Sequence, residues 1–274
     1  MNMKSLSALL GFAGLAFAAS ASASTVFAAD IRNDRFVSFD HTTPSSQTVL
    51  GTAFTPNYFG LDFDASQTNL YALRDTGVVE RLNLTNGAIL NTTSITGSAA
   101  LVTNLSYTGI TFDPFGNGYL STFLSGVGSQ LHSYNASTGA STLIGLMDAD
   151  VTRIVIDIAA RGNGEVWAHS ISNDAFGQVN ISTGTTTWLP THGLAANFAQ
   201  GMDFDWSTDT LIAAVYTGGG TNTYGSVNLT TGAVTSLGAI TAGEYELAIQ
   251  AVPEPTTMTL LALGALAARR RRKS

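Results

Sequence analysis

Four segments of similar sequence, repeated about every 46 residues, predict an all-β protein of the β-propeller class. Two further observations favour this class. Every repeat contains the same turn-forming pattern, and a lone strand near the C-terminal end supplies the element that the N-terminal end lacks. The whole chain has only 6 Pro residues, and no long 3.6-residue periodicity occurs outside the two ends, so we expect little helix.

The first element of each repeat is an apolar strand that ends near an Asp. Its copies occupy residues 60–64, 109–113, 156–158 and 201–205. The aligned residues Phe63, Phe112, Ile158 and Phe204 are spaced by 49, 46 and 46. A second apolar strand follows each copy, at Leu70-Tyr71, Tyr119-Leu120, Val166-Trp167 and Leu211-Ile212. This period, with four strands per unit, is typical of a propeller blade, whose faces are covered by its neighbours.

The third strand of each repeat runs into a turn of sequence Asn-x-Ser/Thr-x-Gly. Its copies are 83–87, 135–139, 180–184 and 228–232. Apolar residues flank each Asn, as in a strand, and the Gly takes the positive φ that closes a short hairpin loop. The Asn-x-Ser/Thr triplets also match N-glycosylation acceptors, but their common position in the repeat favours turn chemistry.

The two ends of the body complete the blade count. Residues 24–50 supply strands at 25–31, 35–40 and 47–50 but no first strand, whereas 246–252 read as a lone first strand. We therefore predict a five-bladed β-propeller closed by pairing of its N- and C-terminal strands, which leaves no open edge. Residues 24–252 form this domain, with about 46 residues per blade; an open repeat array or a β-sandwich is the alternative.

The distribution of charge excludes several classes of function. The chain has a net charge of −7, and residues 24–255 carry all 19 acidic residues but only 6 of the 12 basic ones. An acidic body argues against binding of nucleic acid or of an anionic membrane surface. The absence of Cys excludes disulfides, thiol catalysis and Cys-ligated zinc.

Residues 1–23 have the pattern of a secretory signal peptide. Lys4 supplies the positive charge, an apolar run follows, and small residues precede a cleavage site that we place after Ala23, with Ala21 as the close competitor. Signal peptidase is the expected partner. An N-terminal membrane anchor is the weaker alternative, because the apolar run is short and ends in a cleavable pattern.

The C-terminal end, residues 253–274, has three parts. Pro253, Glu254 and Pro255 precede an apolar segment, 256–268, and a basic cluster follows, comprising Arg269, Arg270, Arg271, Arg272 and Lys273. The 13 apolar residues make a helix of about 20 Å, short of the roughly 30 Å hydrocarbon core. This length suits transient insertion, with the basic cluster held in the cytoplasm; an ordinary tail anchor is the alternative.

This tripartite tail resembles the PEP-CTERM sorting signal of Gram-negative bacteria over about 23 residues. The resemblance implies that an exosortase-type membrane protease recognises Pro253, Glu254 and Pro255, while Arg269 to Lys273 act as the basic stop. It also implies an inner-membrane intermediate, followed by display at the cell surface or release to the exterior. The repeats are similar to propeller-like repeats of secreted bacterial proteins, a resemblance that implies the fold and no activity.

Carboxylates are the best candidates for a functional site in the body. Asp62, Asp157 and Asp203 align at one position of the innermost strand, where they could ring a central channel and bind Ca²⁺. The alternative is that each Asp caps backbone donors. Asp64, Asp113 and Asp205 lead directly into turns, which is typical of Asx-turns.

Other side chains give weaker indications of a site. The four histidines, His41, His132, His169 and His192, fall in no metal-ligand spacing, and no G-x-S-x-G sequence is present. Trp167 is expected in a blade core, whereas Trp188 and Trp206 lie nearer loops and are candidates for ligand contacts.

The sequence thus predicts an exported protein with a non-catalytic propeller that contacts protein or polysaccharide, without an assigned cofactor. The alternative is a secreted glycan-active hydrolase with carboxylates at the channel.

Overall fold

The computed structural model describes residues 24–52, 57–198 and 201–251. These described residues belong to one compact unit. The predicted signal peptide with its cleavage site at Ala23, and the predicted tail with Pro253 to Pro255, the apolar segment and the basic cluster, lie outside the described residues.

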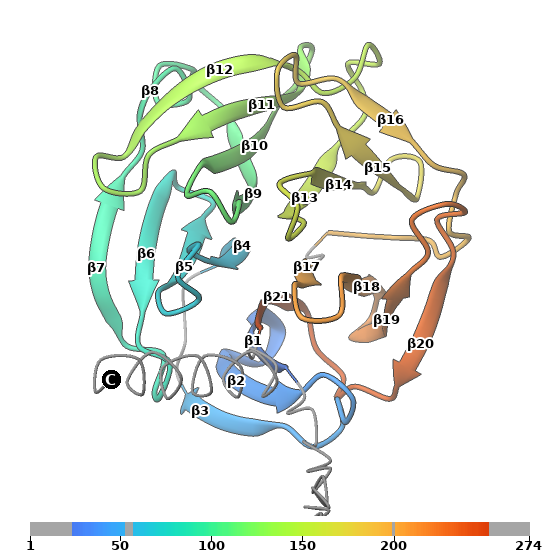
Figure 1. Cartoon of the computed structure of the whole chain (residues 1–274). Coiled ribbons are helices and arrows are strands. Elements are labelled where there is room, and N and C mark those ends of the chain that lie inside the picture. The colour runs from blue at the N-terminus through green and yellow to red at the C-terminus, as the bar shows by residue number, and fades with distance from the viewer. Residues whose placement is uncertain (1–23, 53–56, 199–200, 252–274) are drawn as a thin grey trace, which may run out of the picture. The chain divides into compact units, whose positions relative to one another are not determined.

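Five sheets, antiparallel except for one added strand in blade 3, are arranged as blades around a centre (Figure 1). Blade 1 combines both ends of the body in the order β21 (Tyr245–Gln250), β1 (Thr25–Asp30), β2 (Arg35–Asp40) and β3 (Thr48–Thr52). Blade 2 contains β4 (Tyr58–Phe63), β5 (Leu70–Arg74), β6 (Val78–Leu82) and β7 (Ile89–Ser94). The first strand of each blade lies nearest the centre, as the repeat predicted.

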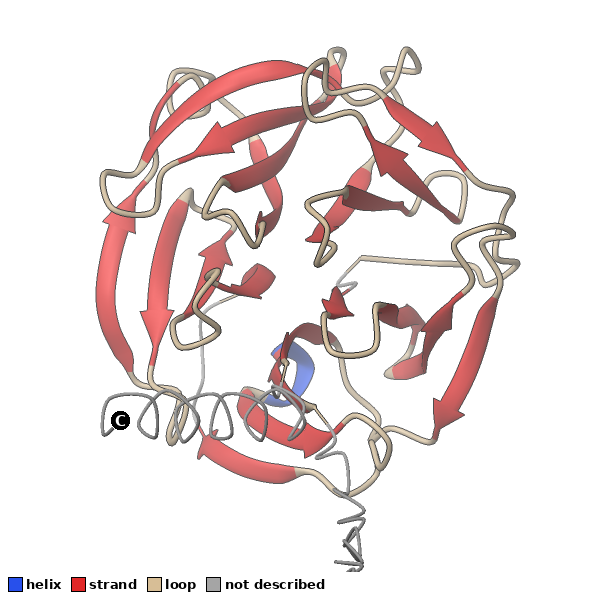
Figure 2. Ribbon diagram, in the orientation of Figure 1, coloured by secondary structure: helices blue, strands red, loops and turns tan. Residues whose placement is uncertain are grey.

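The other three blades follow in chain order. Blade 3 contains β9 (Ser106–Phe112), β10 (Gly118–Leu124), β11 (Gly128–Tyr134) and β12 (Ala140–Leu146), with β8 (Thr96–Gly97) paired parallel to β12 as an extra outer strand. Blade 4 contains β13 (Val155–Ala160), β14 (Val166–Ser170), β15 (Ala175–Val179) and β16 (Thr186–Trp188). Blade 5 contains β17 (Gly201–Asp205), β18 (Thr210–Gly218), β19 (Thr221–Val227) and β20 (Val234–Gly238). Within the described residues the only helix is a 3-10 turn, η1 (Ile31–Asn33) (Figure 2).

The ring closes as predicted. Strand β21 pairs antiparallel with β1 through six residue pairs, from Thr25 opposite Gln250 to Asp30 opposite Tyr245. The prediction that both ends of the body build one blade is therefore confirmed, and the open-array alternative is wrong for the described residues.

The Asn-x-Ser/Thr-x-Gly segments form the predicted turns. In each copy the Gly N–H donates to the carbonyl of the Asn at 2.8 Å, and the Asn side chain accepts a backbone N–H two residues on. Gly139 shows why this position needs glycine: its φ is +74°, and a Cβ there would lie 2.3 Å from the Ser94 carbonyl oxygen of blade 2. The turn thus also packs one blade against the one before it.

The hydrophobic core lies between neighbouring blades. One cluster joins Phe27 and Phe36 of blade 1 to Phe63 of blade 2, with the rings of Phe27 and Phe63 edge-to-face at 5.7 Å. Another joins Trp167 of blade 4 to Phe204 of blade 5. Each blade therefore buries its faces against its neighbours.

Candidate functional site

The three carboxylates selected from the sequence lie on innermost strands and are almost completely buried. Asp62 on β4, Asp157 on β13 and Asp203 on β17 are at most 3% exposed. One oxygen of each accepts the N–H of the residue that follows it. The other oxygen accepts a backbone N–H from the next blade, from Phe112 at 2.7 Å, Met202 at 2.9 Å and Ile249 at 2.6 Å respectively. These carboxylates therefore bridge adjacent blades.

Thr111 on β9 bridges blade 3 to blade 4 in the same way, although it is not a carboxylate. Its hydroxyl accepts the Ala160 N–H of blade 4 at 2.8 Å and donates to Asp62 at 2.6 Å. The sequence signal was its alignment with Asp62 in the repeat, and our selection of acidic residues missed it. Side-chain bridges thus run from blade 2 to 3, 3 to 4, 4 to 5 and 5 to 1.

Strand pairing corrects the predicted position of Asp157. The aligned second-strand residues Tyr71, Trp167 and Ile212 pair with Asp62, Ala159 and Asp203. Asp157 therefore lies two residues earlier than the sequence alignment placed it, on a strand whose register shifts between Val155 and Asp157. The neighbouring blade accommodates it with a glycine, because a Cβ on Gly109 would lie 2.9 Å from Asp157 Oδ1.

Glu246 on β21 is a further buried carboxyl on an innermost strand, and the sequence reasoning did not select it. It is 0% exposed, and neither of its carboxyl oxygens has a hydrogen-bond partner among the described residues. Burial raises its pKa well above the usual range, and the nearby charge of Asp157 raises it further. A carboxyl in this environment favours its neutral form.

The other three carboxyls share this electrostatic environment. Burial raises the pKa of Asp62 to about 7 and raises the pKa values of Asp157 and Asp203 well above the usual range. Within the described residues, no group of three or more His, Asp or Glu side chains is arranged to hold a metal ion. The calcium hypothesis for Asp62, Asp157 and Asp203 gains no support from this geometry.

The second set of carboxylates forms the predicted Asx-turns. Asp64 accepts from Ser66, Thr68 and Asn69, and Asp113 accepts from Phe115 and Asn117. Asp205 accepts from Ser207 and also from the Ser24 hydroxyl of blade 1, at 3.0 Å. These three residues order the turns that follow the innermost strands.

Three of the four histidines form hydrogen bonds with other side chains of the protein. His132 on β11 contacts the hydroxyls of Ser98 and Thr122, each at 3.0 Å, and burial lowers its pKa to about 4. The Nε2 atoms of His169 and His192 lie 3.0 Å apart. Because His192 Nδ1 accepts the Leu194 N–H, its proton lies on Nε2 and is donated to His169. His41 lies apart, in the turn after β2.

The tryptophans have internal partners too. Trp167 is buried in a blade core, as predicted. The Trp188 N–H donates to Asp148, and the Arg153 guanidinium lies 5.3 Å from the centre of its ring. The Trp206 N–H donates to the Ala160 carbonyl at 2.8 Å. The prediction that Trp188 and Trp206 contact a surface ligand therefore gains no support.

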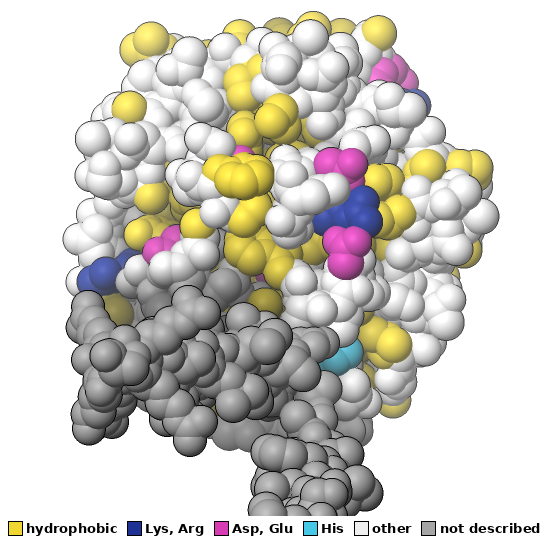
Figure 3. Space-filling model, viewed as in Figure 1, with side chains coloured by type: hydrophobic (Ala, Val, Ile, Leu, Met, Phe, Trp, Pro, Cys, Tyr) yellow, Lys and Arg dark blue, Asp and Glu magenta, His cyan; other side chains and the backbone are white. Residues whose placement is uncertain are grey.

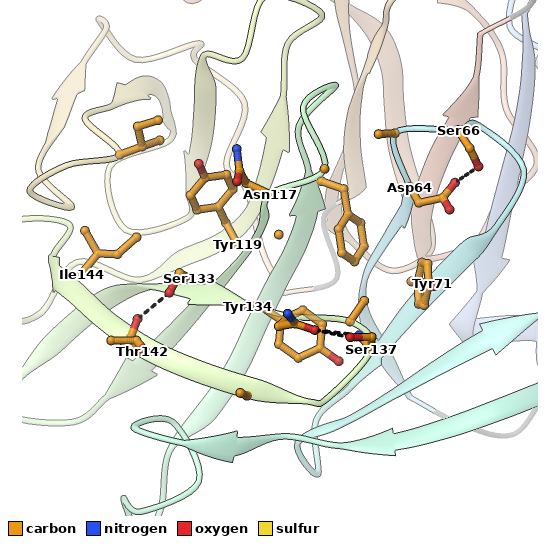
Figure 4. A pocket seen from close by; sticks show the side chains of 18 residues that line it. Asp64, Ser66, Tyr71, Asn117, Tyr119, Ser133, Tyr134, Ser137, Thr142 and Ile144 are labelled. Carbon is orange, nitrogen blue, oxygen red and sulfur yellow. Dashed lines mark hydrogen bonds between the residues drawn. The ribbon is translucent and has the colours of Figure 1, made fainter.

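A cavity of about 930 Å³ lies where turns of blades 2 and 3 meet, and Ile181 of blade 4 reaches it as well. We name it the aromatic pocket, since its lining includes Tyr71, Phe112, Tyr119 and Tyr134. Figure 4 shows Tyr119 and Asn117 on one side, Tyr71 and Asp64 on the other, and Ser133 with Thr142 along β11 and β12. Its volume lies within the roughly 300–1,000 Å³ typical of small-ligand sites.

The sequence reasoning did not find this pocket. Blade 3 departs from the repeat at two paired positions, where Gly118 and Tyr134 replace the aliphatic pairs of blades 2 and 4. Those pairs are Leu70 with Leu82 and Val166 with Val179. The departure was visible in the sequence, but only an alignment of the second and third strands would have revealed it.

No helix long and apolar enough to span a membrane occurs in residues 24–52, 57–198 and 201–251. Residues 251–273 match the PEP-CTERM protein-sorting motif, beginning immediately after β21. The motif marks an exported chain that is processed by exosortase and carried through the membrane to the cell surface.

No curated protein matches the sequence. Among solved structures, a chain of a nidogen/laminin complex is 12% identical with a TM-score of 0.51, and the match covers 83% of this chain and 98% of that one. A protein of unknown function from Bacteroides caccae is 9% identical, with a TM-score of 0.44 and coverages of 78% and 72%. Virginiamycin B lyase from Staphylococcus aureus is 16% identical, with a TM-score of 0.44 and coverages of 84% and 67%. The first of these similarities shows a shared fold.

Proposed function

Because the chain carries a PEP-CTERM sorting motif after a closed propeller, we propose that it is an exported, non-catalytic binding module of the cell surface or extracellular matrix. In this role the propeller attaches to a matrix polysaccharide or protein after exosortase has processed the tail. The propeller supplies the binding surface, and the sorting motif supplies the location.

The observation that carries the non-catalytic part of this proposal is the burial of the three carboxylates on the innermost strands. A glycoside hydrolase needs two carboxyl groups on either side of the bond that it cleaves. Asp62, Asp157 and Asp203 are at most 3% exposed and hold the backbone of neighbouring blades. A polysaccharide cannot reach carboxyls in this position without opening the ring.

The experiment incubates the purified full-length protein with extracellular matrix isolated from the producing cells. We expect sedimentation with the matrix and no release of new reducing sugar ends. The control variant Asp203→Asn keeps a side chain of the same size on β17 and removes a carboxyl. Reducing ends that appear with the wild-type protein and disappear with this folded variant would support the hydrolase instead, and failure to bind any matrix fraction would contradict the proposed role.

A further inference from the structure

We propose that the aromatic pocket of blades 2 and 3 binds an uncharged saccharide segment. This inference rests on the proposed binding role and names the ligand class and the place where it binds. Four features of the pocket carry the argument: its origin in the repeat, its aromatic floor, its hydroxyl and amide rim, and its lack of cations.

The pocket exists because blade 3 differs from its neighbours. Gly118 pairs with Phe112 on one side and with Tyr134 on the other. A Cβ at Gly118 would lie 2.9 Å from the Phe112 ring and 2.6 Å from the Tyr134 carbonyl oxygen, so the ring occupies the space that an aliphatic side chain fills in other blades. The glycine therefore lets an aromatic ring form the floor of the cavity.

Phe112 lies between two tyrosines on this floor. Its ring centre is 5.0 Å from that of Tyr71 and 6.4 Å from that of Tyr134, with interplanar angles of 47° and 54°. Phe112 and Tyr134 are only 4% and 5% exposed, so they support the half-buried Tyr71 ring, which presents the aromatic surface that a ligand can reach. A pyranose ring has faces of C–H groups that pack on such a surface, while its hydroxyls point outward. The Tyr134 hydroxyl is buried and has no hydrogen-bond partner among the described residues, so this floor also contains an unsatisfied polar group.

The rim supplies the hydroxyl and amide groups that a saccharide needs. Asn117, Asn135 and Thr142 line the pocket and are exposed. Within the described residues, protein bonds engage Asn117 through Nδ2 and Asn135 through Oδ1, and none is formed by the Thr142 hydroxyl. The Asn117 oxygen, the Asn135 NH₂ group and the Thr142 hydroxyl are thus available to a ligand that both donates and accepts.

Charge distinguishes the class of saccharide. The lining contains no Lys, Arg or His, so a uronate or phosphate group would find no cation. Its one carboxylate, Asp64, is engaged by Ser66, Thr68 and Asn69. In Figure 3, uncharged side chains cover most of the described part of this face, and the charged side chains form a few separate groups. These features favour a neutral sugar over an acidic one or over a peptide rich in charge.

The test compares binding of the purified full-length protein to dextran, amylose and galactomannan, as neutral probes, with binding to alginate, as an anionic probe. In Thr142→Trp a bulky ring fills the cavity from the exposed strand β12. Thr235→Trp is the matched control: Thr235 is also exposed, lies on the outer strand of blade 5, and pairs with Ser226 as Thr142 pairs with Ser133. Tyr71→Ala, at a half-buried position, removes part of the floor.

We expect at least one neutral probe to bind, with affinity at least about tenfold lower in Thr142→Trp and unchanged in Thr235→Trp. Tyr71→Ala should also weaken binding. If the probe binds equally well to Thr142→Trp, or if only alginate or a matrix protein binds, the inference is wrong although the proposed binding role stands. If no matrix component binds at all, the proposed function itself fails.

Discussion

Blade 1 and the other four blades are similar sheets, but they differ in how the chain builds them and in how they are joined to the next blade. Blades 2 to 5 are each formed by one continuous segment, and a buried side chain links each of them to the next blade. Blade 1 is formed by both ends of the body, and Ala248 precedes the bridging residue Ile249 just as Thr111 precedes Phe112.

The Ala248 side chain offers no acceptor at this position, as Ala159 offers none in blade 4. Blade 4 bridges through Asp157, two residues earlier, whereas Glu246 at that place in blade 1 forms no hydrogen bond among the described residues. Blade 1 therefore shows no equivalent bridge to blade 2 in the described part of the chain.

At the junction from blade 1 to blade 2, the turn between β4 and β5 contacts the end of β21 instead. The Gln67 side-chain oxygen accepts the Ala251 N–H at 2.9 Å, and its carbonyl oxygen accepts from the Gln250 side chain at 2.8 Å. Closure of the ring therefore depends on the pairing of β21 with β1, on this contact and on the apolar cluster that joins Phe27 and Phe36 to Phe63. From this comparison we expect the closing strand to contribute most to the stability of the ring, the side-chain bridges less, and the unbridged carboxyl Glu246 least.

Disruption of the closing strand should have the largest effect. Leu247 is 0% exposed and pairs with Ala28 in the core between blades 5 and 1. Leu247→Asp places a charge there and should cost more than about 4 kcal/mol, enough to keep the ring open. Urea denaturation and resistance to protease measure this effect.

The matched control for this variant is Leu143→Asp, on the outer strand β12 where Leu143 is 46% exposed. We expect it to change the free energy of unfolding by less than about 0.5 kcal/mol. Equal stability of the two variants would show that the closing strand is not required.

Removal of one bridge should have an intermediate effect. Asp203→Ala leaves the Ile249 N–H buried without its acceptor, which costs about 1–3 kcal/mol. The control is Asp64→Ala, which removes a carboxylate that orders only its own turn and should destabilise less. Both variants are compared by urea denaturation at pH 5. A loss for Asp203→Ala no greater than that for Asp64→Ala would contradict the bridging role.

Local patterns in the sequence predicted the ring and its closure. The Asn-x-Ser/Thr-x-Gly turns and the lone strand that ends near Gln250 each depend on neighbouring residues, so period and turn chemistry were sufficient to find them. The extra strand β8 has only two residues and gives no such pattern.

Contacts between blades were not predictable in the same way. Whether Asp62 reaches the Phe112 N–H depends on how one blade is positioned against the next, and this is set by packing rather than by local sequence. The pairing of Trp167 with Ala159, rather than with Asp157, also depends on where the hairpin between β13 and β14 turns. The aromatic pocket depends on a pair of departures, Gly118 and Tyr134, that are unremarkable when each strand is considered alone.

The smallest predicted effect concerns the unbridged carboxyl. Glu246, Asp62, Asp157 and Asp203 all have pKa values raised by burial, so the folded ring binds more protons than the unfolded chain. The stability associated with these groups is complete below about pH 4 and is lost as the pH rises through their folded pKa values, about 7 for Asp62. Thermal unfolding from pH 4 to pH 9 should show this decline.

Glu246→Gln removes one ionisable group without breaking a protein hydrogen bond among the described residues. The variant should unfold at a temperature close to that of the wild type at pH 4 and a few degrees higher at pH 8, because the wild-type protein must either hold Glu246 neutral or bury its charge. Glu165→Gln is the control: Glu165 is partly exposed and its pKa is lowered by Arg161, so this variant should lose stability at pH 8 rather than gain it. An identical pH dependence for the wild type and Glu246→Gln would show that Glu246 is not a source of the decline.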